Sequence, residues 1–178
     1  WQNILAGKSG IAAVTKFDVS TFPVKFAGEV KNFDITQYIS AKDARRMDDF
    51  IHFGLAAGIQ AVRDAGLDKE NVVDLERVGV AIGSGIGGLP LIEATQLEYA
   101  AGGVRKVSPF FVPGSIINMI SGNLSIEFGF KGPNIALVSA CTTGTHSIGD
   151  AARIIEYGDA DIMVAGGAES TVSPLGMG

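Results

Sequence analysis

The sequence predicts an α/β fold in which helices cover both faces of a largely parallel sheet. Short apolar runs at 78–82, 134–139 and 162–165 have the length and β-branched character of buried strands. Segments with helical periodicity separate these runs, and such a βαβ order favours parallel neighbours. Hydrophobic residues make up 47% of the 178-residue chain, which fits one domain with a sizeable core or half of a larger one. The loops that follow the strands should therefore meet at one edge of the sheet.

Composition and charge exclude several classes of protein. A net charge of −5 argues against a general nucleic-acid binder, whose surface is usually basic. The only cysteine has no partner for an internal disulfide and no segment resembles a secretory signal, so we expect a reducing, cytoplasmic location. Residues 107–126 carry no charge, but their prolines and polar side chains would leave polar groups unpaired in lipid. We expect buried protein there and no membrane association.

The amino-terminal 40 residues give mixed signals. A short helical fragment near Trp1 should end at Gly7, and 26–33 is a possible strand. Ser40 is a good N-cap for one long amphipathic helix that Gly66 closes.

The apolar face of this helix carries Gly54 and Gly58, so we expect another element to pack closely against it. A polar connection at 68–76 leads to the rest of the chain. In order, the expected elements are a strand at 78–82, a glycine loop at 83–88, a helix at 90–99, a loop at 101–114, a helix at 115–127, a strand at 134–139, a helix at 142–157 and a strand at 162–165.

The loop Gly83-Ser-Gly-Ile-Gly-Gly satisfies the GxGxxG pattern between a strand and a helix, so a dinucleotide site is one interpretation. That site also requires an acidic residue about twenty residues further on, and the segment 101–106 has none. A tight turn that lines another kind of pocket is the favoured interpretation. A dinucleotide-binding oxidoreductase remains the alternative from a different enzyme class.

Cys141 lies where the strand at 134–139 turns into the helix at 142–157. A lone cysteine is often a small buried hydrophobe, but the unpaired N–H groups and the dipole of a helix start stabilise a thiolate. Small neighbours leave room for an incoming carbonyl group. A thiolate that attacks this carbonyl creates an oxyanion, which backbone N–H groups of the turn can hold. The position therefore predicts acyl transfer through a thioester.

The helix behind Cys141 is expected to be structural, with a stripe that faces the core: Ile148, Ala151, Ala152 and Ile155. A cysteine nucleophile usually needs a histidine. His146 lies about a turn and a half into this helix and should point away from the thiol, and His52 lies within the earlier helix. We interpret both as structural, so the acid/base groups are expected outside this chain.

Five basic residues form two groups, one near a helix start and one in a loop: Lys42, Arg45, Arg46, Arg105 and Lys106. Cations in the first turn of a helix oppose its dipole, so stability alone does not explain the first group. Solvated surface charge, partly balanced by nearby aspartates, is the alternative to a binding surface.

Four stretches together resemble the β-ketoacyl-acyl carrier protein synthases, in the family's motif order and along nearly the whole chain. They are Val138-Ser-Ala-Cys-Thr-Thr-Gly-Thr-His, Gly83-Ser-Gly-Ile-Gly-Gly, Pro109-Phe-Phe-Val-Pro and Val164-Ala-Gly-Gly-Ala-Glu-Ser. The glycine loop and the helix after Cys141 look like the synthase II branch of the family, which elongates long acyl chains in fatty-acid synthesis.

The resemblance implies a thiolase-like fold, in which two similar halves stack as α-β-α-β-α layers. Residues 1–178 would form the amino-terminal half, apparently cut at both ends. Cys141 would take an acyl group from acyl carrier protein, and the carbanion from malonyl-carrier protein would attack the thioester. The backbone N–H of Cys141 would be one oxyanion donor. The histidines and the lysine that promote decarboxylation would lie outside this chain, which alone should lack condensing activity.

Further site residues follow from the same resemblance. Ile86 matches a residue at the bottom of the acyl pocket, and Phe111 matches one that reaches into the partner's pocket in a homodimer. The five basic residues match the patch that receives acyl carrier protein. Neither a cofactor nor a metal is implied. Alternatives are a synthase I, a polyketide-type ketosynthase, or a non-catalytic chain-length-factor-like subunit, which would lack the cysteine.

Overall fold

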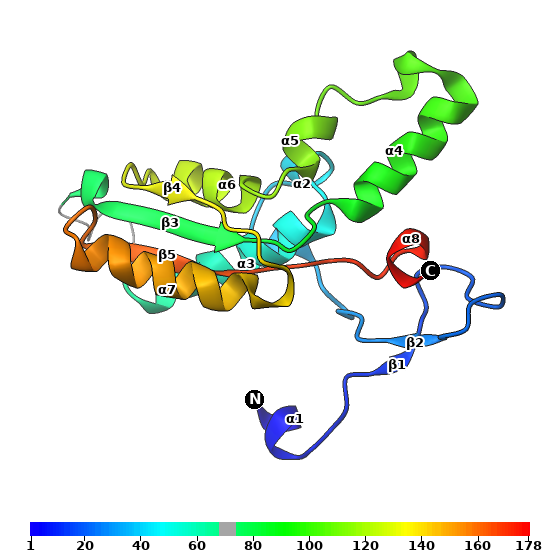
Figure 1. Ribbon diagram of the computed structural model, residues 1–178, viewed down its shortest axis with the longest axis horizontal. Helices are drawn as coiled ribbons and strands as arrows, with labels where there is room; N and C mark the ends of the chain where they lie inside the picture. The colour runs from blue at the N-terminus through cyan, green and yellow to red at the C-terminus, as the bar shows by residue number, and fades with distance from the viewer. Residues whose placement is uncertain (68–73) are drawn as a thin grey trace.

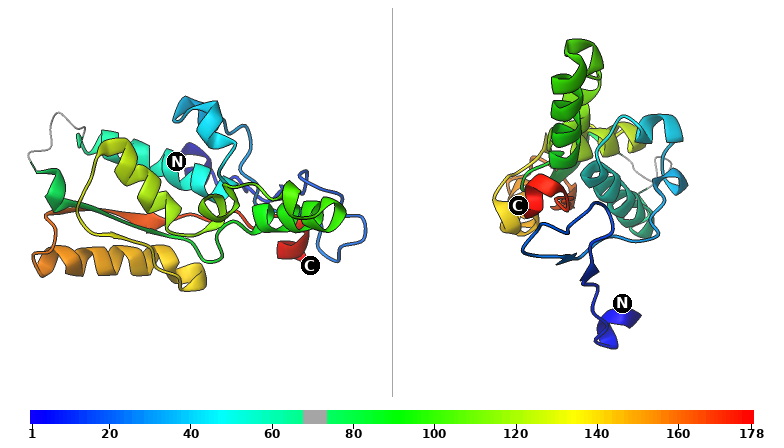
Figure 2. Two further views of the ribbon diagram at one scale, coloured as in Figure 1. Left: turned by 90° about the horizontal axis from the view of Figure 1, so that it is seen from above. Right: turned by 90° about the vertical axis from the view of Figure 1, so that its right-hand side faces the viewer.

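A small parallel sheet organises the computed structural model, which describes residues 1–67 and 74–178. The central strand β3 (Val78–Gly83) pairs in parallel with both β4 (Asn134–Ile135) and β5 (Ile162–Gly167), in the order β4-β3-β5. Helix α7 (Thr143–Glu156) covers one face, and α3 (Asp49–Asp64) and α6 (Met119–Phe128) lie on the other (Figures 1 and 2). The predicted parallel sheet with helices on both faces is confirmed.

The hydrophobic core lies between α3, β3 and α6. Its buried members are Phe50, Ile51, Leu55, Ile59, Val62, Val78, Val80, Ile82, Ile120, Leu124, Phe128 and Phe130. The two glycines of α3 face α6, because a Cβ added at Gly54 would lie 2.6 Å from Ile120 and one added at Gly58 would lie 2.8 Å from Leu124. The expected close packing against this face is confirmed, and α6 is the element that makes it.

The segment predicted as one helix from Ser40 to Gly66 is two helices. Ser40 caps the short α2 (Ala41–Ala44) by accepting a hydrogen bond from the backbone N–H of Asp43. The chain then turns, and Asp48, in an extended conformation, caps α3. The break occurs because the N–H of Asp48 donates to the carbonyl of Gly114, a tertiary bond that helical periodicity does not reveal.

This break overturns the dipole argument for the two arginines of the first basic group, whereas Lys42 still lies at the start of α2. Arg45 is the C-cap of α2 and Arg46 follows it, so neither lies in the first turn of a long helix. A cation near a helix C-terminus is favourable. Helix stability therefore gives no reason to assign a binding function to these arginines.

The stripe predicted to face the core from α7 is also wrong for most of its members. Thr143, Ser147 and Ala151 are buried, whereas Ile148 and Ile155 are 59% and 41% exposed. The reason is close approach: a Cβ added at Gly167 in β5 would lie 3.1 Å from the Cα of Gly144, so small side chains fit best between helix and sheet.

Among the remaining elements, α1 (Gln2–Leu5), β2 (Phe26–Ala27) and α4 (Leu89–Gly102) lie where a helix or strand was expected. The others were not expected: β1 (Ala12–Ala13), η1 (Ile35–Gln37), η2 (Leu75–Arg77), η3 (Val104–Lys106), α5 (Phe111–Ser115), η4 (Ala140–Thr142) and α8 (Pro174–Met177). Two short helices thus lie in the expected loop at 101–114, and only two residues of the strand expected at 134–139 pair with β3.

The amino-terminal segment extends away from the sheet, where β1 and β2 form a small antiparallel ladder (Figures 1 and 2). Of the polar connection expected at 68–76, residues 68–73 lie outside the described residues. Among residues 1–67 and 74–178, none of the helices has the length and apolar character needed to cross a bilayer.

Candidate active site

One pocket of about 490 Å³ lies at the carboxyl edge of the sheet. The ends of β3 and β5 meet there, because Gly83 pairs with Gly167. Three loops line the pocket: the glycine loop after β3, the turn before α7 and the segment after β5. The lining residues that matter most below are Ile86, Cys141 and Glu169. The structure therefore brings the two candidate residues Ile86 and Cys141 to one pocket, as expected from parallel strand ends.

Cys141 lies in the 3₁₀ turn η4 immediately before α7, with an exposed, unbridged thiol. Threonine side chains brace this turn. The hydroxyl of Thr143 accepts from the N–H of Ser139 at 2.9 Å and donates to the carbonyl of Ala140 at 2.7 Å, and Thr142 Oγ1 donates to Ser139 O at 2.7 Å. The threonines of the Cys-Thr-Thr motif thus hold Cys141 in place.

Ala140 has a φ of +53°, a left-handed conformation that residues other than glycine rarely adopt. It is the residue directly before Cys141. Such strain is found where surrounding contacts impose it, often beside a reacting group. Sequence patterns do not indicate this feature, because alanine is not a residue that marks left-handed turns.

The glycine loop closes around the carboxylate of Glu169, which follows β5. Ser84 Oγ donates to Oε1 at 2.8 Å, and the N–H of Ile86 donates to Oε2 at 2.9 Å. The N–H of Gly87 is shared between Oε1, at 3.3 Å, and Ser84 Oγ, at 3.1 Å. The loop donors that would bind phosphate in a dinucleotide site therefore face a carboxylate, which would repel pyrophosphate. This geometry disfavours the dinucleotide interpretation.

Glu169 was missed as a site residue. Its one signal in the sequence is a carboxylate that directly follows the Gly-Gly-Ala end of a strand. The pairing partner of that strand end, the glycine loop, is about eighty positions away, so the contact depends on the sheet order.

Ile86 is 56% exposed and lies on the pocket wall. Phe111 is half-buried at the start of α5 and is not among the residues that line the pocket. The two segments are nevertheless connected, because the N–H of Gly88 donates to the carbonyl of Ser115 at 2.9 Å. The glycine loop and the helix of Phe111 are therefore bonded to each other.

The five basic residues do not share one environment. Lys42, Arg45, Arg105 and Lys106 are exposed. Arg46 is half-buried: its guanidinium lies 4.1 Å from the centre of the Phe110 ring and 3.8 Å from the Asp43 carboxylate. Arg105 and Lys106 lie in η3, at the end of α4 that is farthest from the sheet (Figure 1). Arg46 is thus a packing residue as well as a cation.

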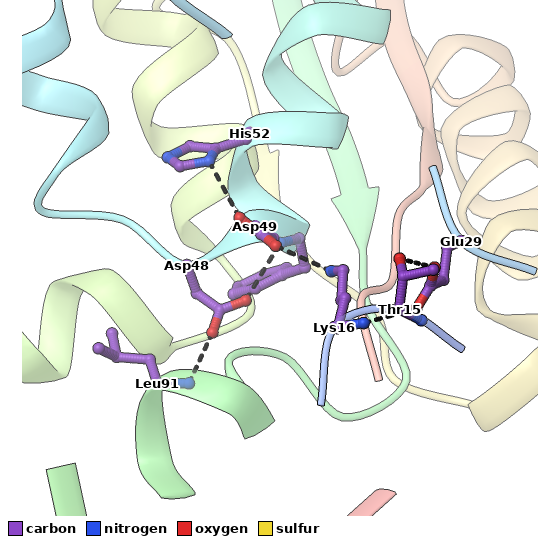
Figure 3. A network of polar contacts seen from close by, with 8 residues as sticks. Thr15, Lys16, Glu29, Asp48, Asp49, His52 and Leu91 are labelled. Atoms are coloured by element: carbon purple, nitrogen blue, oxygen red, sulfur yellow. Dashed lines mark hydrogen bonds and ion pairs between the residues drawn. The ribbon is translucent and has the colours of Figure 1, made fainter. Parts of the chain in front are cut away.

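A buried carboxylate fixes the start of α4, the helix that follows the glycine loop. Asp48 accepts from the N–H of Phe50 at 3.2 Å and from the N–H of Leu91 at 2.8 Å (Figure 3). Burial raises the pKa of Asp48, and these two hydrogen bonds oppose the rise. Asp48 therefore joins the starts of α3 and α4.

Beside it, Asp49 bridges His52 and Lys16 (Figure 3). The hydrogen bond from His52 is the main reason that the pKa of Asp49 falls to about 2. Burial lowers the pKa of His52, but Asp49 and the carbonyl of Ala44, 2.9 Å from Nε2, raise it overall. His52 thus ties α2 to α3, which agrees with its structural interpretation.

His146 lies on α7 with its Nδ1 2.6 Å from the hydroxyl of Ser139. The ring braces the same turn as the threonines and is not among the residues that line the pocket with Cys141. Neither histidine of the chain therefore has the position of a partner for the thiol.

Comparison with known proteins gives a consistent result. Residues 1–178 match the family model described as "Beta-ketoacyl synthase, N-terminal domain". The chain is 60% identical, over 177 residues, to a 3-oxoacyl-[acyl-carrier-protein] synthase 2 of Vibrio cholerae, with 99% of this chain and 42% of that protein covered. It is 52% identical to the synthase 2 of Coxiella burnetii over 178 residues, which are all of this chain and 43% of that protein. The chain thus spans about two-fifths of the length of these curated relatives.

Solved structures also resemble this chain. A β-ketoacyl synthase from Burkholderia phymatum superposes with a TM-score of 0.82 at 26% identity, over 96% of this chain and 42% of that chain. A type II PKS acyl-carrier protein in complex with its ketosynthase matches with a TM-score of 0.75 at 28% identity, over 83% of this chain and 42% of that chain.

Proposed function

Because this chain belongs to the β-ketoacyl synthase family, we propose that the whole protein elongates fatty-acyl chains by decarboxylative condensation. The resemblance drawn from the motifs, and with it the thiolase-like fold, is confirmed. The observation that carries the proposal is the braced, exposed Cys141 in the same pocket as Ile86. Identity of 60% to a 3-oxoacyl-[acyl-carrier-protein] synthase 2 supports fatty-acid rather than polyketide synthesis.

In the proposed reaction, the Cys141 thiolate attacks the carbonyl of an acyl thioester on acyl carrier protein. The resulting oxyanion accepts a hydrogen bond from the backbone N–H of Cys141, and its collapse expels the carrier thiolate. Malonyl-carrier protein then loses CO₂, and the carbanion left behind attacks the acyl-cysteine carbonyl. This step expels the Cys141 thiolate and gives a 3-oxoacyl carrier protein longer by two carbons. Groups beyond this chain promote the decarboxylation.

The first test identifies the acylated residue. The full-length protein is incubated with a long-chain acyl carrier protein, and the modified peptide is mapped by mass spectrometry. The acyl group should be found on Cys141, should be released by neutral hydroxylamine, which cleaves thioesters, and should be absent from the intact mass of Cys141→Ala. An acyl group on any other residue of the wild type would contradict the mechanism.

Carrier binding is proposed for the exposed basic residues, because acyl carrier protein is strongly acidic and complementary charge speeds encounter. Arg45→Glu and Arg105→Glu should raise KM for acyl carrier protein about tenfold and leave KM for a small acyl thioester unchanged. Arg46→Glu should impair both substrates, because it also removes the packing on Phe110. An equal loss with both substrates for Arg45→Glu would mean that its role is structural.

We also propose a homodimer in which Phe111 contributes to the partner's pocket. The bond between Gly88 and Ser115 supports this proposal, because it attaches the helix of Phe111 to the pocket loop. Sedimentation of the full-length protein should give a dimer. Phe111→Ala should then change acyl-chain selectivity without dissociating it.

A further inference from the structure

The carboxylate of Glu169 is bound by the glycine loop. Its two carboxylate oxygens receive three hydrogen bonds, from Ser84 Oγ and from the N–H groups of Ile86 and Gly87. These three hydrogen bonds form the anchor of the loop. Ser84 is fully buried, so the anchor is fixed at one end in the core. The carboxylate therefore ties the loop after β3 to the segment after β5.

The middle of the loop is enclosed on two sides. A Cβ added at Gly85 would lie 2.7 Å from Oε2 of Glu169 and 3.3 Å from both Cα and the carbonyl oxygen of Ala140. Ala140 is the strained residue before Cys141. The loop thus lies between the Glu169 carboxylate and the turn that contains Cys141. It can move away from Cys141 only if its hydrogen bonds to Glu169 break.

We propose that Glu169 is a positioning residue that sets the depth of the acyl pocket by holding the backbone of Ile86. The inference rests on the proposed function, because it assigns Ile86 to the wall that limits chain length. While the N–H of Ile86 is bonded to Oε2, the side chain of Ile86 enters the pocket from a fixed backbone. A long acyl chain must then fit beside Ile86. Loss of the anchor lets the loop yield to longer chains.

The chemistry of the anchor requires an acid. Three donors converge on two oxygens, and an ionised carboxylate accepts all of them. Glutamine has nearly the same shape, but it has one acceptor oxygen and its NH₂ group would face N–H donors. Glu169→Gln therefore removes part of the hydrogen bonding and its charge, with little change in volume.

The test compares acylation of Cys141 in the full-length protein by a series of acyl carrier proteins of increasing chain length. The wild type should show a length beyond which the acylation rate falls. In Glu169→Gln the ratio of long-chain to short-chain kcat/KM should rise about tenfold, the size expected for loss of a charge-assisted hydrogen bond. Glu156→Gln, the same change at the exposed end of α7, should keep the wild-type ratio.

Hydrogen exchange gives a second measurement that does not depend on activity. The peptide that contains residues 84–88 should exchange faster in Glu169→Gln and at the wild-type rate in Glu156→Gln. An unchanged chain-length ratio in an active Glu169→Gln protein would overturn the inference, whatever the exchange rate.

Ser84→Ala keeps the test decisive if Glu169→Gln does not fold. It removes one donor and leaves the two backbone bonds, so the ratio should move in the same direction by a smaller factor, and no movement would overturn the inference. If none of the acyl carrier proteins acylates Cys141 of the wild type, the proposed function fails. Exchange of residues 84–88 then decides separately whether the anchor exists.

Discussion

At the residue scale, conformational strain lies beside the reactive thiol. Ala140 has a φ of +53°, and Thr143 holds its carbonyl through a 2.7 Å hydrogen bond. For an L-residue the left-handed region costs roughly 1–2 kcal/mol. The side-chain bonds of Thr142 and Thr143 to the backbone of Ser139 offset this cost and fix the direction in which Cys141 projects.

Substitutions at Ala140 should reveal that strain. Ala140→Gly should change stability by less than about 0.5 kcal/mol, because relief of strain and the greater unfolded-state entropy of glycine roughly cancel. Ala140→Val should destabilise by about 1–3 kcal/mol, because β-branched residues tolerate positive φ poorly. Denaturant unfolding of the full-length protein measures both, and the rate of Cys141 acylation should fall for the valine variant alone. Equal stability of the two variants would contradict the strained geometry.

The Asp49–His52 pair should make stability depend on pH. The folded-state pKa of Asp49 is about 2, below its ordinary 3.8, so its contribution is present above pH 3.8 and is lost as pH falls through about 2. The pKa of His52 is raised above 6.5, so its contribution is present below pH 6.5 and is lost as pH rises past the folded-state value. The pair thus contributes most between these limits.

Asp49→Asn tests that window. With the Asp49 side chain 48% exposed, solvent screening limits the effect to about 1 kcal/mol. The apparent Tm of the variant should lie about 2 °C below the wild type at pH 5.5, with a smaller gap at pH 8 and none at pH 2. Asp150→Asn, an exposed acid on α7, serves as the control. A gap that is the same at all three pH values would exclude the titration.

At the element scale, periodicity predicted most helices and strands, and tertiary contacts decided what it missed. The strand Val78–Gly83 and the position of Cys141 before a helix followed from local pattern. The break before α3 did not, because it depends on the bond between Asp48 and Gly114. The buried face of α7 did not follow from local pattern either, because small residues face the sheet where the backbones approach closely. Glu169 could be placed at the glycine loop only once the pairing of β3 with β5 was known.

The packing of α3 on α6 gives a prediction for its glycines. Alanine normally stabilises a helix interior by about 1 kcal/mol over glycine. At Gly54, however, the new Cβ would lie 2.6 Å from the fully buried Ile120, so Gly54→Ala should destabilise by about 1–3 kcal/mol through overpacking. Gly122→Ala on α6 is the matched control: its nearest neighbour is 3.8 Å away, and it should stabilise slightly. If denaturant unfolding shows that Gly54→Ala and Gly122→Ala both stabilise the protein, the close contact between Gly54 and Ile120 is contradicted.

At the scale of the whole molecule, the described residues leave much apolar surface uncovered. Leu97, Ile126 and Ile148 are 72%, 76% and 59% exposed. Within residues 1–67 and 74–178, β5 pairs with β3 along one edge and has no strand on the other. Large exposed apolar patches and open sheet edges are typical of surfaces that pack against further protein. The chain spans 42% of the length of its Vibrio cholerae relative, and the rest of that relative is further protein of this kind.

Residues 1–178 expressed alone should therefore bind a hydrophobic dye such as ANS and form no 3-oxoacyl product from acyl- and malonyl-carrier proteins. The chain supplies Cys141 and the loop of Ile86, but neither histidine contacts the thiol's pocket, so decarboxylation lacks its acid/base groups. The full-length protein should show weak dye binding and full condensation. Product formation by the isolated segment, at a rate near that of the full-length protein, would mean that the groups for decarboxylation lie within these residues. Loss of product in Cys141→Ala of both proteins would exclude a contaminating synthase.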